Sequence, residues 1–151
     1  WMKLSPSIGD VEELVQAAAP LVDGFVAINS VGPALDFNPA APRPRLGSSW
    51  GQGWLSGPPI LPRALAFVSR VAQAQPKPVV GVGGIASGED AAKFLMAGAS
   101  LVQVCTAALQ GGPGTYGRIA RELDGWLDRH GYASVSDLQG RYAAALEARR
   151  P

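Results

Sequence analysis

One stretch decides the fold of this chain: Pro78-Val79-Val80-Gly81-Val82-Gly83-Gly84-Ile85-Ala86-Ser87-Gly88-Glu89-Asp90. Its first five residues are almost continuously apolar, which is typical of a strand buried on both faces of a parallel sheet. Two glycines then end the strand. Ser87 with Asp90 three residues later has the form of a helix N-terminal capping box. The stretch therefore predicts a strand, a tight glycine turn and a helix.

The same strand-then-helix pattern recurs on both sides of this stretch. The other predicted strands are Met2-Lys3-Leu4, Phe25-Val26-Ala27-Ile28 and Leu101-Val102-Gln103-Val104, the last two also expected to be buried. Helical apolar spacing follows each of them, in residues 11–18, 61–72 and 119–127. Alternation of this kind predicts an α/β domain with a parallel sheet. Two architectures fit it, an open doubly wound sheet and a (β/α)₈ barrel. A complete barrel takes about 250 residues, so four βα units would make half of one.

A long connection over residues 30–60 interrupts the alternation. Prolines occur at positions 33, 39, 42 and 44, and the stretch Gly47-Ser48-Ser49-Trp50-Gly51-Gln52-Gly53-Trp54-Leu55-Ser56-Gly57 follows them. Ordinary βα connections have about 2–6 residues. The connection is either a disordered insertion or a functional loop or hairpin over a site. Its two tryptophans favour the functional loop or hairpin, because disordered tracts are poor in aromatic residues.

Composition bounds the remaining possibilities. The chain has 151 residues, of which 47% are hydrophobic, so we expect one domain, 1–151, with its own core and a helical tail over 132–151. A net charge of +1 gives no footprint for nucleic acid or an anionic membrane. The single cysteine forms no internal disulfide, and the spacing of the potential ligands predicts no metal site. The longest uncharged run, 94–117, is too interrupted to predict a transmembrane segment.

The candidate site residues lie where the predicted strands end, because parallel α/β folds bind ligands at the carboxyl ends of their strands. Gly83 and Gly84 permit a phosphate to approach backbone N–H groups beside a helix N-terminus. Cys105 and Thr106 end the next strand, where a hydroxyl and backbone amides can complete the same cradle. A Gly-Gly turn alone is usually a plain turn, but the two adjacent ends together predict a phosphate-bearing cofactor.

Other polar residues at the strand ends have two interpretations each. Lys3 either extends outward along its stem or meets an anion. Asn29 and Ser30 suit hydrogen bonding to a polar heterocycle, although Asn is also a common turn residue. Cys105 has no second cysteine or strand-end histidine to activate it. His130 lies at the end of the last long helix, where the helix dipole accounts for it. We expect neither Cys105 nor His130 to be catalytic.

Five motifs taken together resemble the dihydroorotate dehydrogenase family: Lys3-Leu4-Ser5-Pro6, Ala27-Ile28-Asn29-Ser30, Leu55-Ser56-Gly57, Gly81-Val82-Gly83-Gly84-Ile85 and Gln103-Val104-Cys105-Thr106-Ala107. Their order and spacing are similar to the C-terminal half of that family's TIM-type (β/α)₈ barrel. The flavin domain of dihydropyrimidine dehydrogenase shares several of them, including the cysteine. The segment Gly131-Tyr132-Ala133-Ser134 favours dihydroorotate dehydrogenase.

The resemblance implies an FMN-dependent, cytoplasmic oxidoreductase that oxidises dihydroorotate to orotate in pyrimidine biosynthesis. Carried over by motif, Lys3 lies by the flavin ring, and Asn29 and Ser30 hold the pyrimidine substrate. The FMN ligands implied in this way, besides Lys3, are Ile28, Ser56, Gly57, Gly83, Gly84, Cys105 and Thr106. Many relatives have glycine where this chain has Cys105.

The family's catalytic base, a Cys or Ser, belongs to the N-terminal half of the barrel, so the resemblance assigns no catalytic residue here. Because Trp1 directly precedes a strand-like segment, we expect this chain to be the back part of a larger protein. Alone it should be inactive, and an N-terminal half-barrel chain or self-association should complete it. Two alternatives stay open, a dihydropyrimidine dehydrogenase-type flavin domain and a non-catalytic half-barrel module that self-associates. The electron acceptor is not predicted.

Overall fold

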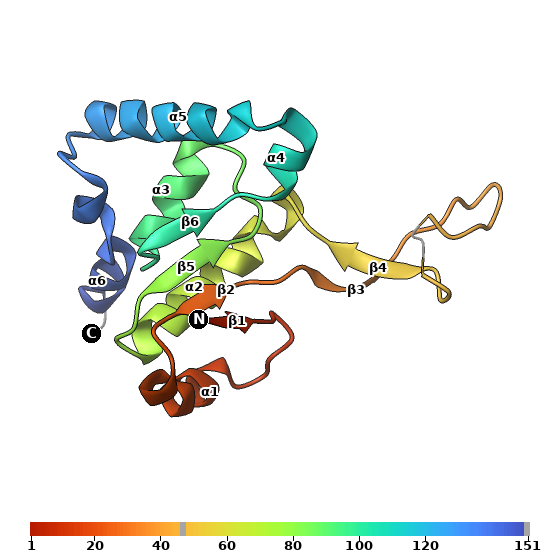
Figure 1. The fold of residues 1–151 in the computed structure, drawn as a ribbon, viewed down its shortest axis with the longest axis horizontal. Helices are drawn as coiled ribbons and strands as arrows, with labels where there is room; N and C mark the ends of the chain where they lie inside the picture. The colour runs from red at the N-terminus through yellow and green to blue at the C-terminus, as the bar shows by residue number, and fades with distance from the viewer. Residues whose placement is uncertain (46–47, 150–151) are drawn as a thin grey trace.

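A four-stranded parallel sheet forms the centre of the computed structural model, which describes residues 1–45 and 48–149. Gly47, where the predicted Gly/Trp/Ser stretch begins, and residues 150–151 of the predicted tail lie outside the described residues. The strands lie in the order β1 (Met2–Leu4), β2 (Phe25–Ala27), β5 (Val79–Val82) and β6 (Leu101–Gln103). Each pairs in parallel with the next (Figure 1). The predicted strands are therefore present, each within a residue or so of its expected bounds.

The main helices that follow the strands form one layer in the same order as the strands. They are α1 (Val11–Ala18), α2 (Leu61–Ala74), α3 (Gly88–Met96) and α5 (Gly114–His130). Helix α1 contacts α2, α2 contacts α3, and α3 contacts α5 (Figure 1). A doubly wound sheet carries helices on both faces and reverses its strand order. A single helix layer over strands in sequential order is instead the arrangement of part of a (β/α)₈ barrel.

The core lies between the sheet and this helix layer. Leu4 and Phe25 from the strands and Val15, Val68 and Phe94 from the helices are fully buried there. A Cβ atom at Gly81 of β5 would lie 2.4 Å from Phe94 Cδ1, so the Phe94 ring packs directly on the strand backbone. Burying one large apolar side chain contributes about 1.5–3 kcal/mol. Periodic apolar residues on both layers therefore account for the way the helices cover the sheet.

Strand β6 corrects one expectation. The apolar run Leu101-Val102-Gln103-Val104 was expected to be buried on both faces, yet Leu101 is 62% exposed and Gln103 is also exposed. The reason is position, because β6 is an edge of the sheet and pairs only with β5. Strand β1 is the other edge, where Lys3 is exposed. The apolar composition of residues 101–104 indicates a strand, but it does not tell whether another strand pairs with each of its two edges.

The long connection between β2 and α2 contains a hairpin that projects from the sheet (Figure 1). Its strands β3 (Val31–Leu35) and β4 (Gln52–Leu55) pair in antiparallel fashion as a separate two-stranded sheet. The Trp54 ring covers Gly32, where a Cβ atom would lie 2.8 Å from Trp54 Cδ1. An ion pair of 3.3 Å joins Arg45 Nη1 to Asp36 Oδ2 farther along the hairpin. These contacts join the two sides of the hairpin.

The C-terminal segment packs against α3 and α5. It contains a 3₁₀ turn, η3 (Val135–Leu138), and helix α6 (Arg141–Glu147). Leu138 is fully buried beneath α3, and the Tyr132 ring stacks on Trp126 with centroids 5.7 Å apart.

A short helix, α4 (Thr106–Gly111), follows β6 and was not predicted. None of the helices in residues 1–45 and 48–149 has the length and apolarity needed to cross a membrane.

Candidate functional site

The carboxyl ends of the four parallel strands meet at one cavity of about 240 Å³. All ten residues predicted for cofactor or substrate binding line it: Lys3, Ile28, Asn29, Ser30, Ser56, Gly57, Gly83, Gly84, Cys105 and Thr106. Four further residues also line it, Ile60, Val82, Ile85 and Gln103. Three of these lie inside the motifs already quoted. Ile60 comes from a 3₁₀ turn, η2 (Pro58–Ile60), that no pattern in the sequence indicated.

The glycine turn after β5 has a backbone that only glycine adopts readily. Gly83 has φ of 137° and Gly84 has φ of 84°. A Cβ atom at Gly84 would lie 2.8 Å from the Gly57 carbonyl oxygen, so the two loops touch backbone to backbone. Among the described residues, the N–H groups of Gly83, Gly84 and Ile85 find no acceptor. The turn thus places three N–H groups that make no hydrogen bond within the described residues among the residues that line the cavity, and an anion site needs such donors.

The loop after β4 and the start of α4 form the side of the cavity next to this turn. Thr106 Oγ1 donates a hydrogen bond to Ser56 Oγ at 2.9 Å. Gly57 has φ of 76°, and a Cβ atom there would lie 3.0 Å from Thr106 Cγ2. The close approach brings two hydroxyl groups and the glycine turn to the same end of the cavity. Hydroxyl and backbone N–H donors together are typical phosphate ligands.

The segment after β2 continues the sheet past the end of the strand. The Ile28 N–H donates to the Val82 carbonyl at 2.8 Å, and the Asn29 N–H donates to the Leu4 carbonyl at 3.0 Å. These bonds hold Ile28 buried between the strands while the Asn29 side chain stays exposed. Ser30 follows directly and leads into β3. The root of the hairpin therefore carries the amide and hydroxyl groups expected to contact a substrate.

Lys3 and Cys105 are the ionisable side chains that line the cavity, and both are exposed along its open side. Partial burial of the ammonium group lowers the pKa of Lys3, while the charge of a Cys105 thiolate acts in the opposite direction. A bound anion would likewise favour the protonated lysine. The geometry suits Lys3 to pair with a negative group in the cavity.

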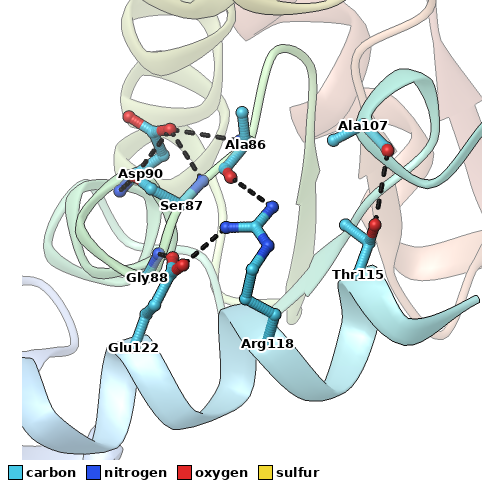
Figure 2. A network of polar contacts seen from close by, with 8 residues as sticks. All are labelled: Ala86, Ser87, Gly88, Asp90, Ala107, Thr115, Arg118 and Glu122. Carbon is cyan, nitrogen blue, oxygen red and sulfur yellow. Dashed lines mark hydrogen bonds and ion pairs between the residues drawn. The ribbon is translucent and has the colours of Figure 1, made fainter. Parts of the chain in front are cut away.

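Helix α5 contacts both loops that carry the candidate phosphate donors (Figure 2). Arg118 Nη2 donates to the Ala86 carbonyl at 3.0 Å, and Glu122 Oε2 accepts from the Gly88 N–H at 2.9 Å. Arg118 and Glu122 also form an ion pair with each other. The hydrogen bond from Arg118, and secondarily the one from Gly88, holds the pKa of Glu122 below its ordinary value. Thr115 Oγ1 lies 3.4 Å from the Ala107 carbonyl in α4.

His130 lies away from the cavity, at the C-terminus of α5. Its Nδ1 is 2.7 Å from the Trp126 carbonyl oxygen, and its ring stacks on Trp126 with centroids 4.0 Å apart. Cys105 is a free, exposed thiol. The structure does not bring the two side chains together, so it offers no Cys–His pair for nucleophilic catalysis. In the part of the chain that the structure describes, no three potential metal-ligating side chains gather at one place.

The chain is similar to proteins of one family. A family model described as dihydroorotate dehydrogenase matches residues 1–127. A putative dihydroorotate dehydrogenase A (fumarate) from Solibacter usitatus is 45% identical over 140 residues, which cover 92% of this chain and 45% of that protein. The catalytic subunit of a dihydroorotate dehydrogenase B (NAD(+)) from Pelobacter propionicus is 43% identical over 141 residues, again covering 92% of this chain and 45% of that protein.

Solved structures give the same result. The ligand-free dihydroorotate dehydrogenase from Eimeria tenella superposes with a TM-score of 0.74 at 27% identity. The superposition covers 99% of this chain and 40% of that protein. A complex of the Eimeria enzyme with ferulenol also has a TM-score of 0.74, at 26% identity. The chain thus spans somewhat less than half the length of the relatives it matches.

Proposed function

Because the chain belongs to the dihydroorotate dehydrogenase family, we propose that its cavity binds FMN within an enzyme that oxidises dihydroorotate to orotate. The observation that carries this proposal is the glycine turn after β5. Its residues line the cavity beside a capped helix and a threonine hydroxyl, and their N–H groups make no hydrogen bond within the described residues. In TIM-type barrels, the loops after the last two strands commonly form a phosphate site. On this proposal, residues 1–151 form a single, partial FMN-binding barrel domain.

The residues present fit the FMN phosphate. A side chain at Gly83 or Gly84 would displace the turn, since a Cβ atom at Gly83 would lie 2.7 Å from Ala64 Cβ in the core. The Gly83, Gly84 and Thr106 groups would hold the phosphate, with Cys105 contributing its backbone. Ser56 and Gly57 would hold the adjoining part of the cofactor, and the buried Ile28 would pack beside it. When bound, FMN supplies an acceptor for the hydride removed from the substrate.

Lys3, Asn29 and Ser30 would act on the ring side of the cavity. The exposed ammonium of Lys3 would lie by the flavin, where a cation stabilises a reduced, anionic ring. The Asn29 amide and the Ser30 hydroxyl would orient the pyrimidine, because each offers both donor and acceptor atoms. Their positions between the end of β2 and the start of β3 support this assignment.

The base that removes the substrate proton would come from outside this chain. Lys3 and Cys105 are the ionisable side chains lining the cavity, and within the described residues neither hydrogen-bonds a side chain that would orient it as a base. Cys105 also occupies the predicted phosphate loop. We therefore assign no catalytic residue to this chain and expect it to be inactive alone. The partner would be an N-terminal half-barrel, either on the same polypeptide or on another, and the complete enzyme would be cytoplasmic.

A chimaera tests the proposed function. This chain would replace the matching part of the Solibacter usitatus relative, which is 45% identical to it over 140 residues. The N-terminal portion of that relative would precede it. The purified chimaera should be yellow, and dihydroorotate should bleach its flavin absorption in the absence of oxygen. A folded chimaera that binds FMN but is bleached only by dihydrouracil would favour a dihydropyrimidine dehydrogenase-type domain. A folded chimaera without flavin would contradict the proposal and favour a non-catalytic module.

A further inference from the structure

We propose that Arg118 and Glu122 of α5 are positioning residues that hold the glycine turn in its anion-binding conformation. The inference rests on the proposed function of that turn. Neither side chain lines the cavity. Both act on the turn from behind, through the backbone of residues 86–88, which link Gly83 and Gly84 to helix α3 (Figure 2).

The glycine turn needs external support because its own residues provide little. Glycine loses more conformational freedom on folding than any other residue, and Gly83 and Gly84 adjoin each other. The three N–H groups that should face an anion make no hydrogen bond within the described chain. The first peptide group after the turn that makes hydrogen bonds is that of Ala86, so Ala86 is where the polar support of the turn begins.

Ala86 is held at both ends of its backbone. Its N–H donates to Asp90 Oδ2 at 3.1 Å, and its carbonyl accepts from Arg118 Nη2 at 3.0 Å. Asp90 also accepts from the Ser87 N–H at 3.1 Å, within the capping box of α3. Asp90 belongs to the helix that the turn enters, whereas Arg118 belongs to a separate helix. The Arg118 contact thus ties the peptide group that follows the turn to a helix other than the one the turn enters.

Glu122 fixes the start of α3 in the same way. It accepts from the Gly88 N–H at 2.9 Å, which satisfies one of the free donors at the helix N-terminus. The two helices approach so closely here that a Cβ atom at Gly88 would lie 2.2 Å from the Leu123 nitrogen. Because no side chain separates the helices, a small shift of α5 would move the end of the glycine turn directly.

Charge gives Arg118 a second effect. The Asp90 and Glu122 carboxylates lie at the N-terminus of α3, where they oppose the binding of another anion nearby. Arg118 pairs with Glu122 and lowers the pKa of that carboxyl group. The carboxylate therefore stays ionised, and the positive charge of Arg118 offsets its negative charge. Without the guanidinium, one more uncompensated negative charge would lie behind the phosphate cradle. Loss of Arg118 should therefore weaken phosphate binding more than loss of Glu122.

The same face of α5 reaches the second loop of the cradle. Thr115, Arg118 and Glu122 have the i, i+3, i+7 spacing of one helix face. Thr115 is buried, and its hydroxyl lies 3.4 Å from the Ala107 carbonyl in α4. One helix face thus contacts the backbone behind both Gly84 and Thr106. This arrangement would keep the two phosphate-binding loops at a constant separation.

The test compares FMN with riboflavin, which lacks the phosphate, as ligands of the full chain. Flavin fluorescence would give the Kd of each for the wild type and for Arg118→Gln, Arg118→Lys and Glu122→Gln. We expect Arg118→Gln to weaken FMN binding by about three- to tenfold and to leave riboflavin unchanged. Glu122→Gln should have a smaller effect. Arg118→Lys keeps the charge but not the planar fork, so it should fall between the wild type and Arg118→Gln.

Arg121→Gln is the matched control, since it removes a neighbouring positive charge from α5 that makes no hydrogen bond to the turn. Hydrogen exchange at Ala86 to Gly88 should accelerate in Arg118→Gln and not in Arg121→Gln. An unchanged FMN-to-riboflavin ratio in folded Arg118→Gln and Glu122→Gln would overturn this inference alone. A wild-type chain that binds both flavins equally, or neither, would overturn the proposed phosphate cradle and this inference with it.

Discussion

Thr106 Oγ1 donates a hydrogen bond to Ser56 Oγ at 2.9 Å, although fifty positions separate the two residues in the chain. The bond joins the end of the hairpin to the start of α4. It also places both hydroxyl groups at the glycine end of the cavity, next to Gly57 and Gly84. We interpret this corner as the site of the FMN phosphate.

Thr106→Val removes the hydroxyl while nearly conserving the shape of the side chain. If Thr106 binds the phosphate, the Kd for FMN should rise by about three- to tenfold, the value of one hydrogen bond. The free energy of unfolding should change little, because the contact is exposed. Ser56→Ala removes the hydrogen-bond partner and keeps the Thr106 hydroxyl, so comparing the two variants separates the role of the Thr106 hydroxyl from that of the Thr106–Ser56 bond. Equal FMN affinity in Thr106→Val and the wild type would contradict the assignment.

Gly84→Ala should disrupt the turn through strain and through collision. Its φ is 84°, and the new methyl group would meet the Gly57 carbonyl at 2.8 Å and Leu61 at 2.9 Å. We expect a loss of at least about 2 kcal/mol in the free energy of unfolding, together with loss of FMN binding. Urea denaturation and flavin fluorescence would measure the two effects.

Gly131→Ala separates strain from collision. Gly131 has φ of 72° at the end of α5, and a Cβ atom there would meet nothing within 4 Å. Its substitution should lower the free energy of unfolding by about 1 kcal/mol and leave FMN binding unchanged. If Gly84→Ala behaved like Gly131→Ala in both measurements, the close contact between the two loops would not matter for the site.

Lys3→Met tests the desolvation of the Lys3 ammonium. Burial lowers the pKa of Lys3 in the folded chain, so the unfolded chain binds more protons just below pH 10.5, the ordinary value. The contribution of Lys3 to stability should therefore rise with pH across that alkaline window. Urea unfolding would give the free energy of unfolding of the wild type and of Lys3→Met between pH 8 and pH 11. The wild-type value minus the Lys3→Met value should grow with pH. A difference that falls with pH would mean that Lys3 is stabilised by a partner instead.

Phe94→Ala tests the packing of the helix layer on the sheet. The ring is fully buried and lies against the Gly81 backbone. Its removal should lower the free energy of unfolding by about 3–5 kcal/mol. Leu109→Ala, at a position that is 82% exposed on α4, should change stability by less than about 0.5 kcal/mol. A loss below about 1 kcal/mol for Phe94→Ala would contradict the described core.

Local patterns predict most of this fold. Short apolar segments locate all four parallel strands, and the Ser87–Asp90 capping box locates the start of α3. The α/β class and the family resemblance are both confirmed. The choice between a doubly wound sheet and a barrel depended on which helices contact each other. Such contacts join residues far apart in the chain, so periodicity within one segment does not report them.

The residues that line the cavity could be predicted from the sequence, whereas the contacts that helix α5 makes behind the glycine turn could not. Strand ends carry the lining residues, because parallel topology brings those ends together. Helix α4 was missed because its six residues are too few to show a period. The contacts of Arg118 with Ala86 and of Glu122 with Gly88 join residues 32 and 34 positions apart. The apolar stripe of α5 predicts which face is buried but not what its polar residues bind.

The backbone N–H groups of Gly83 and Gly84 provide the most direct test of the account. Their amide resonances would be followed by nuclear magnetic resonance while FMN, and separately riboflavin, is added to the chain. We predict that FMN shifts the amide signals of Gly83, Gly84 and Thr106 and that riboflavin leaves them in place. FMN binding that leaves all three signals unmoved would contradict the phosphate cradle.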